Sequence, residues 1–205
     1  LDSIKNYWRV FSGETPGAAQ VCEDFLRSVI NTNEYPLTEL KSMTASETAK
    51  VMENTYRAVN IAFIDEWTKY AETVGIDIFE VIDAIRTRPT HSNIMSPGLG
   101  VGGYCLTKDP AFTPAAMRQI FTGGKDSFPF SQLAMNTNAQ MPNHTVDRLK
   151  QLLEDDLRKK KILILGATYR ANVADTRYTP VQSLVESLEE FESVVSVYDP
   201  LIQTW

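Results

Sequence analysis

A glycine-rich segment that ends in reactive side chains is the first candidate for chemistry. Residues 98–103 hold four glycines in six positions, and Cys105, Lys108 and Asp109 follow directly. Glycines let a backbone approach a ligand closely and leave amide groups free to bind it. A nearby cation raises the thiolate fraction of a cysteine, and a neighbouring carboxylate can hold a water or orient a base. The segment therefore predicts a ligand-binding turn with a nucleophilic thiol. The competing interpretation is a surface loop that contains an incidental cysteine.

A second candidate is the pair Lys50 and Asn54. Their spacing of four residues places both on one face of a helix whose other faces are largely apolar. A lysine is rarely buried without a partner, and a buried asparagine needs a hydrogen bond for its amide. We interpret the pair as facing a polar site. The alternative is that Lys50, in the first helical turn, extends its ammonium group to solvent.

The pair lies in the dominant element of the chain, a helix predicted over residues 46–74. Thr44 and Glu47 have capping-box spacing at its start, and Gly75 supplies its stop. A helix of about 29 residues is roughly 43 Å long and exceeds the width of a small domain. Because it is apolar on most sides, we expect its own domain and a second copy of the chain to cover it. Residues 46–74 thus predict a homodimer.

The remaining periodicities predict a helical domain followed by the start of an α/β domain. Residues 9–13 read as a short strand, residues 161–165 as a buried parallel strand and residues 194–198 as the next strand. Helices are predicted from residue 18 to 30 and over residues 77–86, 114–121, 142–157 and 180–191, the last with a proline in its first turn. We divide the chain at residues 1–13, 14–157 and 158–205. The order after residue 158 is that of one βαβ unit.

A phosphate-binding turn is predicted after the strand at 161–165. Gly98, Gly100 and Gly103 match a GxGxxG pattern, but no strand pattern precedes them, so we discard that match. The turn at residues 166–170 lies at the carboxyl end of a strand, where ligands bind in such sheets. Arg170 and Arg177 are candidates for its positive charge, unless each is simply a solvated surface group.

Composition excludes several classes of protein. Of the 205 residues, 43% are hydrophobic and 22% charged, as in globular domains and unlike disordered chains. The 20 basic and 26 acidic residues give a net charge of −6, which argues against nucleic-acid binding. Runs of about 20 apolar residues are lacking, so we expect no membrane span. The two cysteines lie far apart and the histidines are isolated, so we expect neither a disulfide nor a metal site, and a reducing cytoplasm is the default.

Taken together, the motifs resemble the UDP-glucose/GDP-mannose dehydrogenase family. Residues 9–13 resemble the end of the family's N-terminal NAD domain, and residues 45–54 with Asp65-Glu66 its central-helix motif. Residues 102–109 resemble the catalytic-cysteine motif. Residues 165–170 and 175–180 resemble the opening of the C-terminal UDP-sugar domain. The resemblance implies a Rossmann-like nucleotide-binding fold for residues 158–205 and a catalytic, dimer-forming central domain for residues 14–157.

The resemblance also implies a reaction and a set of roles. The family oxidises a sugar C6 alcohol to a carboxylate with NAD in two steps, through a thiohemiacetal and a thioester on the cysteine. By position, the catalytic residues are Cys105, Lys50 for the oxyanion, Asn54, and Asp109 for proton movement. Lys108 and Arg177 match positions near the cofactor. The positions that bind substrate are Gly102, Gly103, Tyr169, Arg170 and a loop arginine that reaches the partner's active site, for which we choose Arg88 ahead of Arg86.

Departures from the family pattern set further expectations. The glycine fingerprint of the NAD domain and most of the C-terminal domain are missing, so we expect these 205 residues alone to show no turnover. Asp65-Glu66 stands where the family has Asn-Glu, and Arg170 replaces a common lysine. Tyr104, where enzymes for N-acetylhexosamines often have histidine, favours UDP-glucose over a UDP-N-acetylhexosamine, with GDP-mannose as a further alternative. A non-catalytic dimerisation module is the alternative of a different class.

Overall fold

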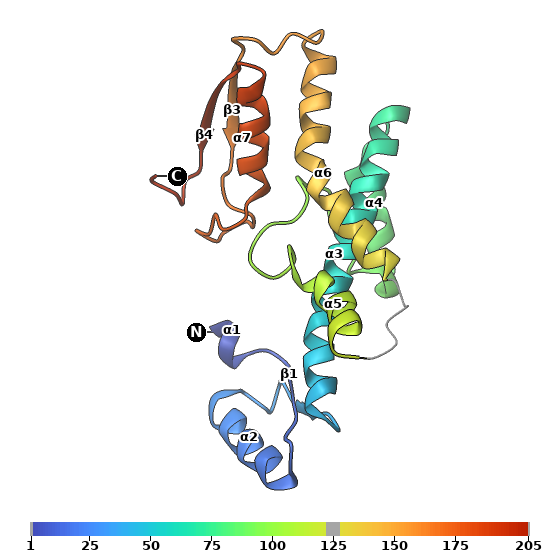
Figure 1. Cartoon of the computed structure of the whole chain (residues 1–205), viewed down its shortest axis with the longest axis vertical. Coiled ribbons are helices and arrows are strands. Elements are labelled where there is room, and N and C mark those ends of the chain that lie inside the picture. The colour runs from blue at the N-terminus through green and yellow to red at the C-terminus, as the bar shows by residue number, and fades with distance from the viewer. Residues whose placement is uncertain (1, 122–127, 205) are drawn as a thin grey trace. The chain divides into compact units, whose positions relative to one another are not determined.

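The structure is a computed structural model that describes residues 2–121 and 128–204. Contacts within the chain group its residues into two compact units, residues 1–53 and 54–205. Figure 1 shows the order of the elements, and each unit is described by itself.

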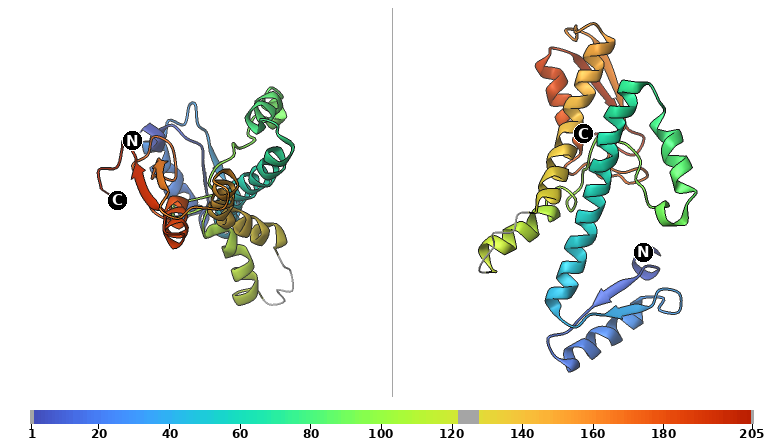
Figure 2. Two further views of the ribbon diagram at one scale, coloured as in Figure 1. Left: turned by 90° about the horizontal axis from the view of Figure 1, so that it is seen from above. Right: turned by 90° about the vertical axis from the view of Figure 1, so that its right-hand side faces the viewer.

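The first unit contains a small parallel β-α-β arrangement. It begins with α1 (Asp2–Lys5) and β1 (Arg9–Phe11), followed by α2 (Pro16–Val29) and β2 (Leu37–Glu39). β1 and β2 pair in parallel, with Arg9 opposite Leu37, and α2 runs alongside both strands (Figure 2). The sequence did not predict β2, whose three residues show no clear alternation. The pairing of β1 with β2 places the segment between them, with α2, in one arrangement with β1.

The long helix, α3, spans Met43–Val74 and starts three residues before the predicted position. The predicted capping box at Thr44 is wrong, because Thr44 already lies inside the helix. Ser42 serves instead, and its hydroxyl oxygen accepts a hydrogen bond from the Ala45 amide at 3.2 Å. Gly75, with φ of 74°, ends the helix as expected.

One side of α3 is buried within the chain and another side is exposed. The buried side chains are Ile64 and five small or polar residues, namely Asn54, Ala58, Ala62, Asp65 and Ala71. Several large apolar side chains of α3 are exposed, namely Met52, Tyr56, Phe63, Trp67 and Tyr70. Small residues allow neighbouring segments to lie close to the helix axis, so the core side of α3 is its small-residue side.

Short elements connect α3 to the cysteine segment and beyond. α4 (Ile78–Arg86) is capped by the Asp77 carboxylate, which accepts from the Phe79 amide at 2.8 Å. Two 3-10 turns, η1 (Pro89–His91) and η2 (Asp109–Ala111), flank the glycine-rich segment. α5 (Phe112–Gln119) begins two residues before its predicted start.

Helix α6 (Pro129–Leu152) is longer than predicted at its N-terminal side. We placed the start at Pro142 because proline favours a first turn, but Pro142 lies in the middle of the helix. Proline has no amide hydrogen, so the carbonyl of Asn138 lacks its usual partner within the helix.

The chain ends in the predicted strand–helix–strand unit. β3 (Lys161–Leu165) and β4 (Val194–Tyr198) pair in parallel over their full length, and α7 (Pro180–Glu190) connects them. α7 lies beside α6 (Figure 1), and the shared core holds Val146, Leu157, Leu184 and Leu188. Among the described helices, none combines the length and apolarity that a membrane crossing needs.

Candidate active site

The glycine-rich segment packs closely against other parts of the second unit, through Leu99 and through its glycines. Leu99 packs against the core shared by α6, α7 and the strands. Gly100 has a φ of 94°, and a Cβ at this position would collide with the carbonyl oxygen of Asn138. This carbonyl is the one that Pro142 leaves without a helical partner. The loop therefore passes α6 at a point where only a glycine fits.

Two further glycines place the loop against the segment that follows β3. A Cβ on Gly102 would lie 2.5 Å from Tyr169 Cβ and 2.8 Å from the Tyr178 carbonyl oxygen. Gly103, with φ of 80°, lies under the Tyr169 ring, and its amide donates to the Arg177 carbonyl at 2.9 Å. The two motifs that the sequence analysis treated separately are thus in direct contact.

Cys105 lies on a tight turn immediately after this contact. Its carbonyl oxygen accepts from the amides of Lys108 and Asp109, at 3.1 and 2.9 Å. The Thr107 hydroxyl donates to the Gly103 carbonyl at 2.9 Å and braces the same turn. The cysteine is exposed, whereas Cys22 is only partly so. The turn therefore presents the thiol to solvent on a rigid support.

A buried carboxylate lies next to this turn and joins two other predicted residues. Asn54 Nδ2 donates to Asp109 Oδ2 at 2.6 Å, and Lys108 Nζ donates to Asp109 Oδ1 at 2.7 Å. Asn54 and Asp109 are both buried, at 1% and 6% exposure. The structure thus brings together Asn54, Lys108 and Asp109, and it satisfies the requirement that a buried asparagine amide be hydrogen-bonded.

Lys108 is held by charge and by aromatic rings. Its ammonium nitrogen lies 4.8 Å from the centre of the Tyr104 ring and 4.5 Å from that of Phe112. The hydrogen bond to Asp109 is the main cause that raises the pKa of Lys108, and the negative charge of Cys105 contributes to the rise. Lys108 is therefore within electrostatic range of the Cys105 side chain.

Arg177 provides a second cation near the cysteine. Its guanidinium group binds the Asp175 carboxylate, with Nη2 2.7 Å from Oδ2. This pairing lowers the pKa of Asp175 to about 2, and the charge of Cys105 is among the causes that raise the pKa of Arg177. The Tyr169 hydroxyl also donates to Asp175, at 3.4 Å. The Asp175 carboxylate thus organises both Tyr169 and Arg177.

Lys50 is more exposed to solvent than Asn54, with which it shares a face of α3. Its ammonium nitrogen lies 3.4 Å from Glu53 Oε2, and its side chain is 61% exposed. This exposure agrees with the solvent-directed interpretation of Lys50. Asn54 follows one turn later on the same face of α3.

The predicted phosphate turn at residues 166–170 is already occupied by a side chain of the protein. Asp199 Oδ2 accepts from the amides of Ala167 and Thr168, at 2.8 and 3.2 Å. These bonds lower the pKa of Asp199, so the carboxylate stays charged. The amides are therefore not free for a phosphate, and the prediction of an open anion site fails here. Arg170 is exposed beside the turn.

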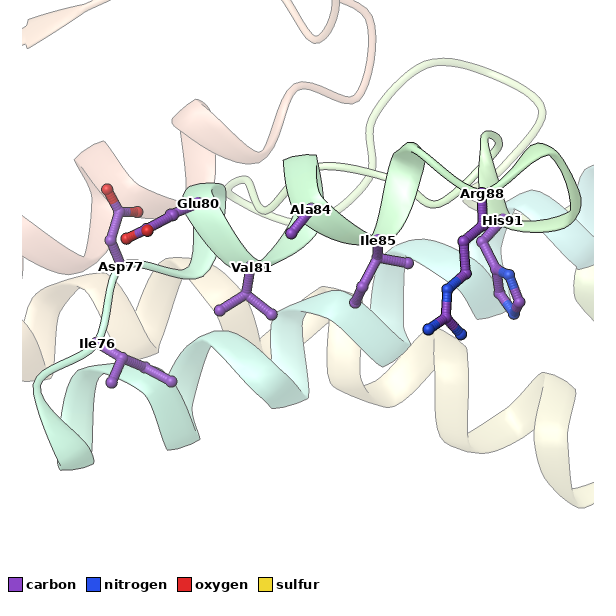
Figure 3. A pocket seen from close by; sticks show the side chains of 8 residues that line it. All are labelled: Ile76, Asp77, Glu80, Val81, Ala84, Ile85, Arg88 and His91. Atoms are coloured by element: carbon purple, nitrogen blue, oxygen red, sulfur yellow. The ribbon is translucent and has the colours of Figure 1, made fainter.

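Arg86 and Arg88, the two arginines considered for the partner's active site, differ in their interactions. Arg86 is committed within its own chain: Nη2 donates to the Ile94 carbonyl at 3.0 Å and to Ser96 Oγ at 2.7 Å. Arg88 instead lines an open groove of about 720 Å³ beside α4, next to His91 (Figure 3). The groove carries apolar residues along α4 and acidic residues Asp77 and Glu80 at its other end. Arg88 is exposed at this groove.

Three contributors to the site escaped the sequence analysis. Phe112 faces Lys108, Asp199 fills the turn after β3, and Asn138 borders Gly100. The only local signal among them was a proline four residues after Asn138, which we interpreted as a helix start.

Comparison with known proteins identifies the family. The central-domain model of the UDP-glucose/GDP-mannose dehydrogenase family matches residues 44–140, and the UDP-binding-domain model of the same family matches residues 163–205. The chain belongs to this family. The central-domain match begins one residue into α3, so the β-α-β arrangement of β1, α2 and β2 precedes it.

Several nucleotide-sugar dehydrogenases are similar to the chain over almost all of its length. The UDP-N-acetyl-D-mannosamine dehydrogenase of Methanocaldococcus jannaschii is 35% identical over 93% of this chain and 41% of its own length. The NDP-N-acetyl-D-galactosaminuronic acid dehydrogenase of Ralstonia solanacearum is 28% identical, covering 95% of this chain and 43% of that protein. The chain thus spans less than half the length of these family members.

Solved structures of family members have the same fold. The UDP-D-ManNAc dehydrogenase of Pyrococcus horikoshii aligns with a TM-score of 0.84 and 29% identity, covering 98% of this chain and 46% of that one. The UDP-N-acetyl-mannosamine dehydrogenase of Staphylococcus aureus aligns with a TM-score of 0.79 and 30% identity, over 100% of this chain and 46% of that one.

Proposed function

We propose that this chain carries the nucleophile of an NAD-dependent nucleotide-sugar dehydrogenase, which oxidises the C6 alcohol of a nucleotide sugar to a carboxylate. The observation that carries the proposal is the exposed Cys105 on a turn whose next residues, Lys108 and Asp109, form a hydrogen-bonded group with Asn54. Family membership supports the reaction class. The reaction uses two soluble metabolites, so we place it in the cytoplasm.

The proposed reaction passes through a covalent bond to Cys105. The alcohol first loses a hydride and a proton and becomes an aldehyde. The Cys105 thiolate adds to the aldehyde carbon, and the oxyanion takes up a proton to give a thiohemiacetal. Loss of a second hydride and a proton converts it to a thioester, which water hydrolyses to the carboxylate and the free thiol. Four electrons leave the sugar in all, as two hydrides, for which NAD would be the acceptor when bound.

The proton and charge movements are proposed to use the group around Asp109. Asp109 accepts hydrogen bonds from Asn54 and Lys108, and such a buried, polarised carboxylate can accept and return a proton near the reacting carbon. Asn54 would orient a water or the substrate oxygen. Lys50 would stabilise the oxyanion by exchanging its exposed partner Glu53 for the added negative charge.

Cofactor and nucleotide binding are proposed for residues beside the cysteine. NAD would supply the hydride acceptor. The residues proposed to bind it are two cations, Lys108 and Arg177, and both interact electrostatically with Cys105. The nucleotide of the substrate is proposed to lie against Gly102, Gly103, Tyr169 and Arg170. The Tyr169 ring lies over Gly103, and Gly102 lies beside the Tyr169 Cβ.

The substrate proposed first is a UDP-N-acetylhexosamine. Tyr104 alone favoured UDP-glucose in the sequence analysis. The similar proteins named above act, by their names, on N-acetylated sugars, and this outweighs a single position. UDP-glucose and GDP-mannose are the alternatives to be measured beside it.

The second part of the proposal is a homodimer formed through residues 46–74. Phe63, Trp67 and Tyr70 form an exposed, mutually contacting row on α3, with ring centres 6.1 and 5.6 Å apart. Beside them, a hollow of about 200 Å³ between α3 and α6 is lined by further exposed apolar side chains, including Phe130 and Leu133. An exposed apolar patch of this kind marks an interaction surface. A second copy would cover it, and Arg88 would extend toward the site of that copy.

The test is NADH formation by the complete gene product with each candidate nucleotide sugar. We expect two NADH per sugar consumed, with a UDP-N-acetylhexosamine the preferred substrate. A yield of one NADH per sugar would contradict the thioester route, and no NADH with any of them would favour a non-catalytic dimerisation module. The isolated 205 residues are expected to show no turnover under the same conditions.

A further inference from the structure

The turn that carries Cys105 is held from one side by the segment between β3 and α7. The Gly103 amide donates to the Arg177 carbonyl at 2.9 Å, and the Gly103 backbone lies against the Tyr169 ring. The Thr107 hydroxyl donates to the Gly103 carbonyl and closes the turn around the cysteine. A movement of residue 169 or 177 is therefore passed to the backbone two residues before Cys105.

The segment between β3 and α7 needs side-chain contacts to keep its shape. Residues 166–179, all of them described, form turns and bends and belong to neither a helix nor a strand. Asn172 and Tyr178 have φ of 60° and 52°, left-handed conformations that cost free energy for residues with a side chain. Such a backbone persists only where surrounding contacts fix it.

Asp175 supplies contacts of this kind to both residues that touch Gly103. Its carbonyl accepts from the Tyr169 amide at 3.3 Å, and its Oδ2 accepts from the Tyr169 hydroxyl at 3.4 Å. Its Oδ1 accepts from the Arg177 amide at 3.0 Å, and its Oδ2 accepts from Arg177 Nη2 at 2.7 Å. Asp175 thus binds each of the two residues through both the backbone and the side chain.

These contacts require a carboxylate. The Asp175 side chain is only 16% exposed, against 68% for Arg177, so the carboxylate is the more enclosed member of the pair. An asparagine would present one oxygen and one amino group, and the amino group cannot accept from Arg177. The hydrogen bonds from Arg177 are the main cause that lowers the pKa of Asp175 to about 2, so the group is charged at neutral pH.

We propose that Asp175 is a positioning residue for Cys105, on which it acts through the backbone of Gly103. It fixes the Tyr169 ring and the Arg177 carbonyl, and these two groups hold Gly103 in place. The effect of Asp175 on catalysis rests on the proposed function. Its hydrogen-bonded connection to the cysteine turn does not.

Hydrogen–deuterium exchange of the complete gene product tests this connection without any substrate. In Asp175→Asn we expect exchange in residues 102–107 to be about tenfold faster than in the natural protein, because charge-assisted hydrogen bonds that hold the Arg177 carbonyl in place are lost. Exchange in β3 should not change. The matched control is Glu192→Gln, which alters another carboxylate–arginine pair of the same unit, with Arg158 Nε 2.8 Å from Glu192 Oε2. It should leave residues 102–107 as they are.

The kinetics of NADH formation separate positioning from nucleotide binding. A misplaced thiol slows the chemical steps, so we expect kcat of Asp175→Asn to fall about tenfold or more, with a smaller change in KM for the nucleotide sugar. Glu192→Gln should keep both constants. A rise in KM with kcat unchanged would mean that Asp175 serves nucleotide binding alone, and this would overturn the proposal.

Two exchange results would also overturn it. One is unchanged exchange in residues 102–107, and the other is an equal increase in β3, which would mean general loosening of the unit. If Asp175→Asn does not fold, Asp175→Glu replaces it, since this variant keeps the charge but displaces the carboxylate by one methylene. The same local increase is then expected. If the natural protein forms no NADH with any nucleotide sugar, the proposed function fails, and the exchange result still decides whether Asp175 holds the turn.

Discussion

At the scale of single residues, Asp109 is the centre of the site. Its two oxygens are used by different partners, Oδ2 by Asn54 and Oδ1 by Lys108. A carboxamide at this position would offer one oxygen and one amino group, so it cannot accept from both donors. The arrangement therefore requires a carboxylate, and an asparagine of the same shape cannot replace it.

Asp109→Asn is expected to lower kcat for NADH formation by about 100-fold or more, the range typical for loss of a positioned acid–base group. The matched control is Asp24→Asn, at an exposed aspartate whose side chain accepts a hydrogen bond from Gln20 of the same helix. Circular dichroism checks that both variants fold. Full activity of Asp109→Asn would remove Asp109 from the mechanism.

Asp65 gives a prediction for stability against pH. Its pKa is raised from 3.8 in the unfolded chain to about 6 in the folded protein, so the folded state binds the proton more tightly. Its contribution to stability is therefore complete below pH 4 and is lost as pH rises to 6. The total loss is about 3 kcal/mol. Urea unfolding at pH 4 and pH 7 should show this loss in the natural chain relative to Asp65→Asn, and a constant difference between the two would refute it.

Single residues could be predicted where local patterns carry the signal. The cysteine, its following Lys-Asp pair and Asn54 all emerged from residue type and spacing, and the structure joins Asn54 to Asp109 across 55 positions. Phe112 and Asp199 were missed because their partners lie elsewhere in the chain and no spacing rule connects them. Asp65 was noticed only as a departure from a family pattern, since a single carboxyl letter does not reveal burial.

At the scale of elements, the passage of the Cys105 loop beside α6 is the critical contact. Pro142 frees the carbonyl of Asn138, and Gly100 passes against this carbonyl with φ of 94°. Neither feature alone has an obvious purpose. Together they let a loop and a helix approach more closely than a side chain would allow.

Gly100→Ala is expected to destabilise the protein by about 2–4 kcal/mol, from the collision with Asn138 and from the positive φ. The matched control is Gly98→Ala, where an added Cβ meets no atom within 4 Å. Thermal unfolding of the two variants measures the difference. Equal melting temperatures would show that the loop does not pass α6 as described.

Elements were predicted well where composition is unambiguous. β3 and β4 were found residue for residue, because short apolar runs with β-branched side chains bounded by turn residues leave little choice. β2 and the first half of α6 were missed. β2 has only three residues, too few to show an alternating pattern. The first half of α6 carries polar residues that obscure the helical period, so we took Pro142, which lies inside the helix, for its first residue.

At the scale of the whole molecule, the exposed aromatic row on α3 predicts self-association. Trp67→Glu is expected to weaken the dimer by about 30-fold or more, since buried aromatic anchors dominate interfaces. Val21→Glu, at an equally apolar and 70% exposed position on α2, is the matched control and should leave the dimer intact. Light scattering over a concentration series measures both. A monomeric natural protein would contradict the proposed role of residues 46–74.

The most direct test of the central claim is alkylation of the two cysteines by iodoacetamide in the complete gene product, followed by mass spectrometry. If Cys105 is the nucleophile, it should react much faster than Cys22, and a UDP-sugar together with NAD should protect it. Reaction of Cys105 at the rate of Cys22, with no protection by substrate and cofactor, would contradict the account.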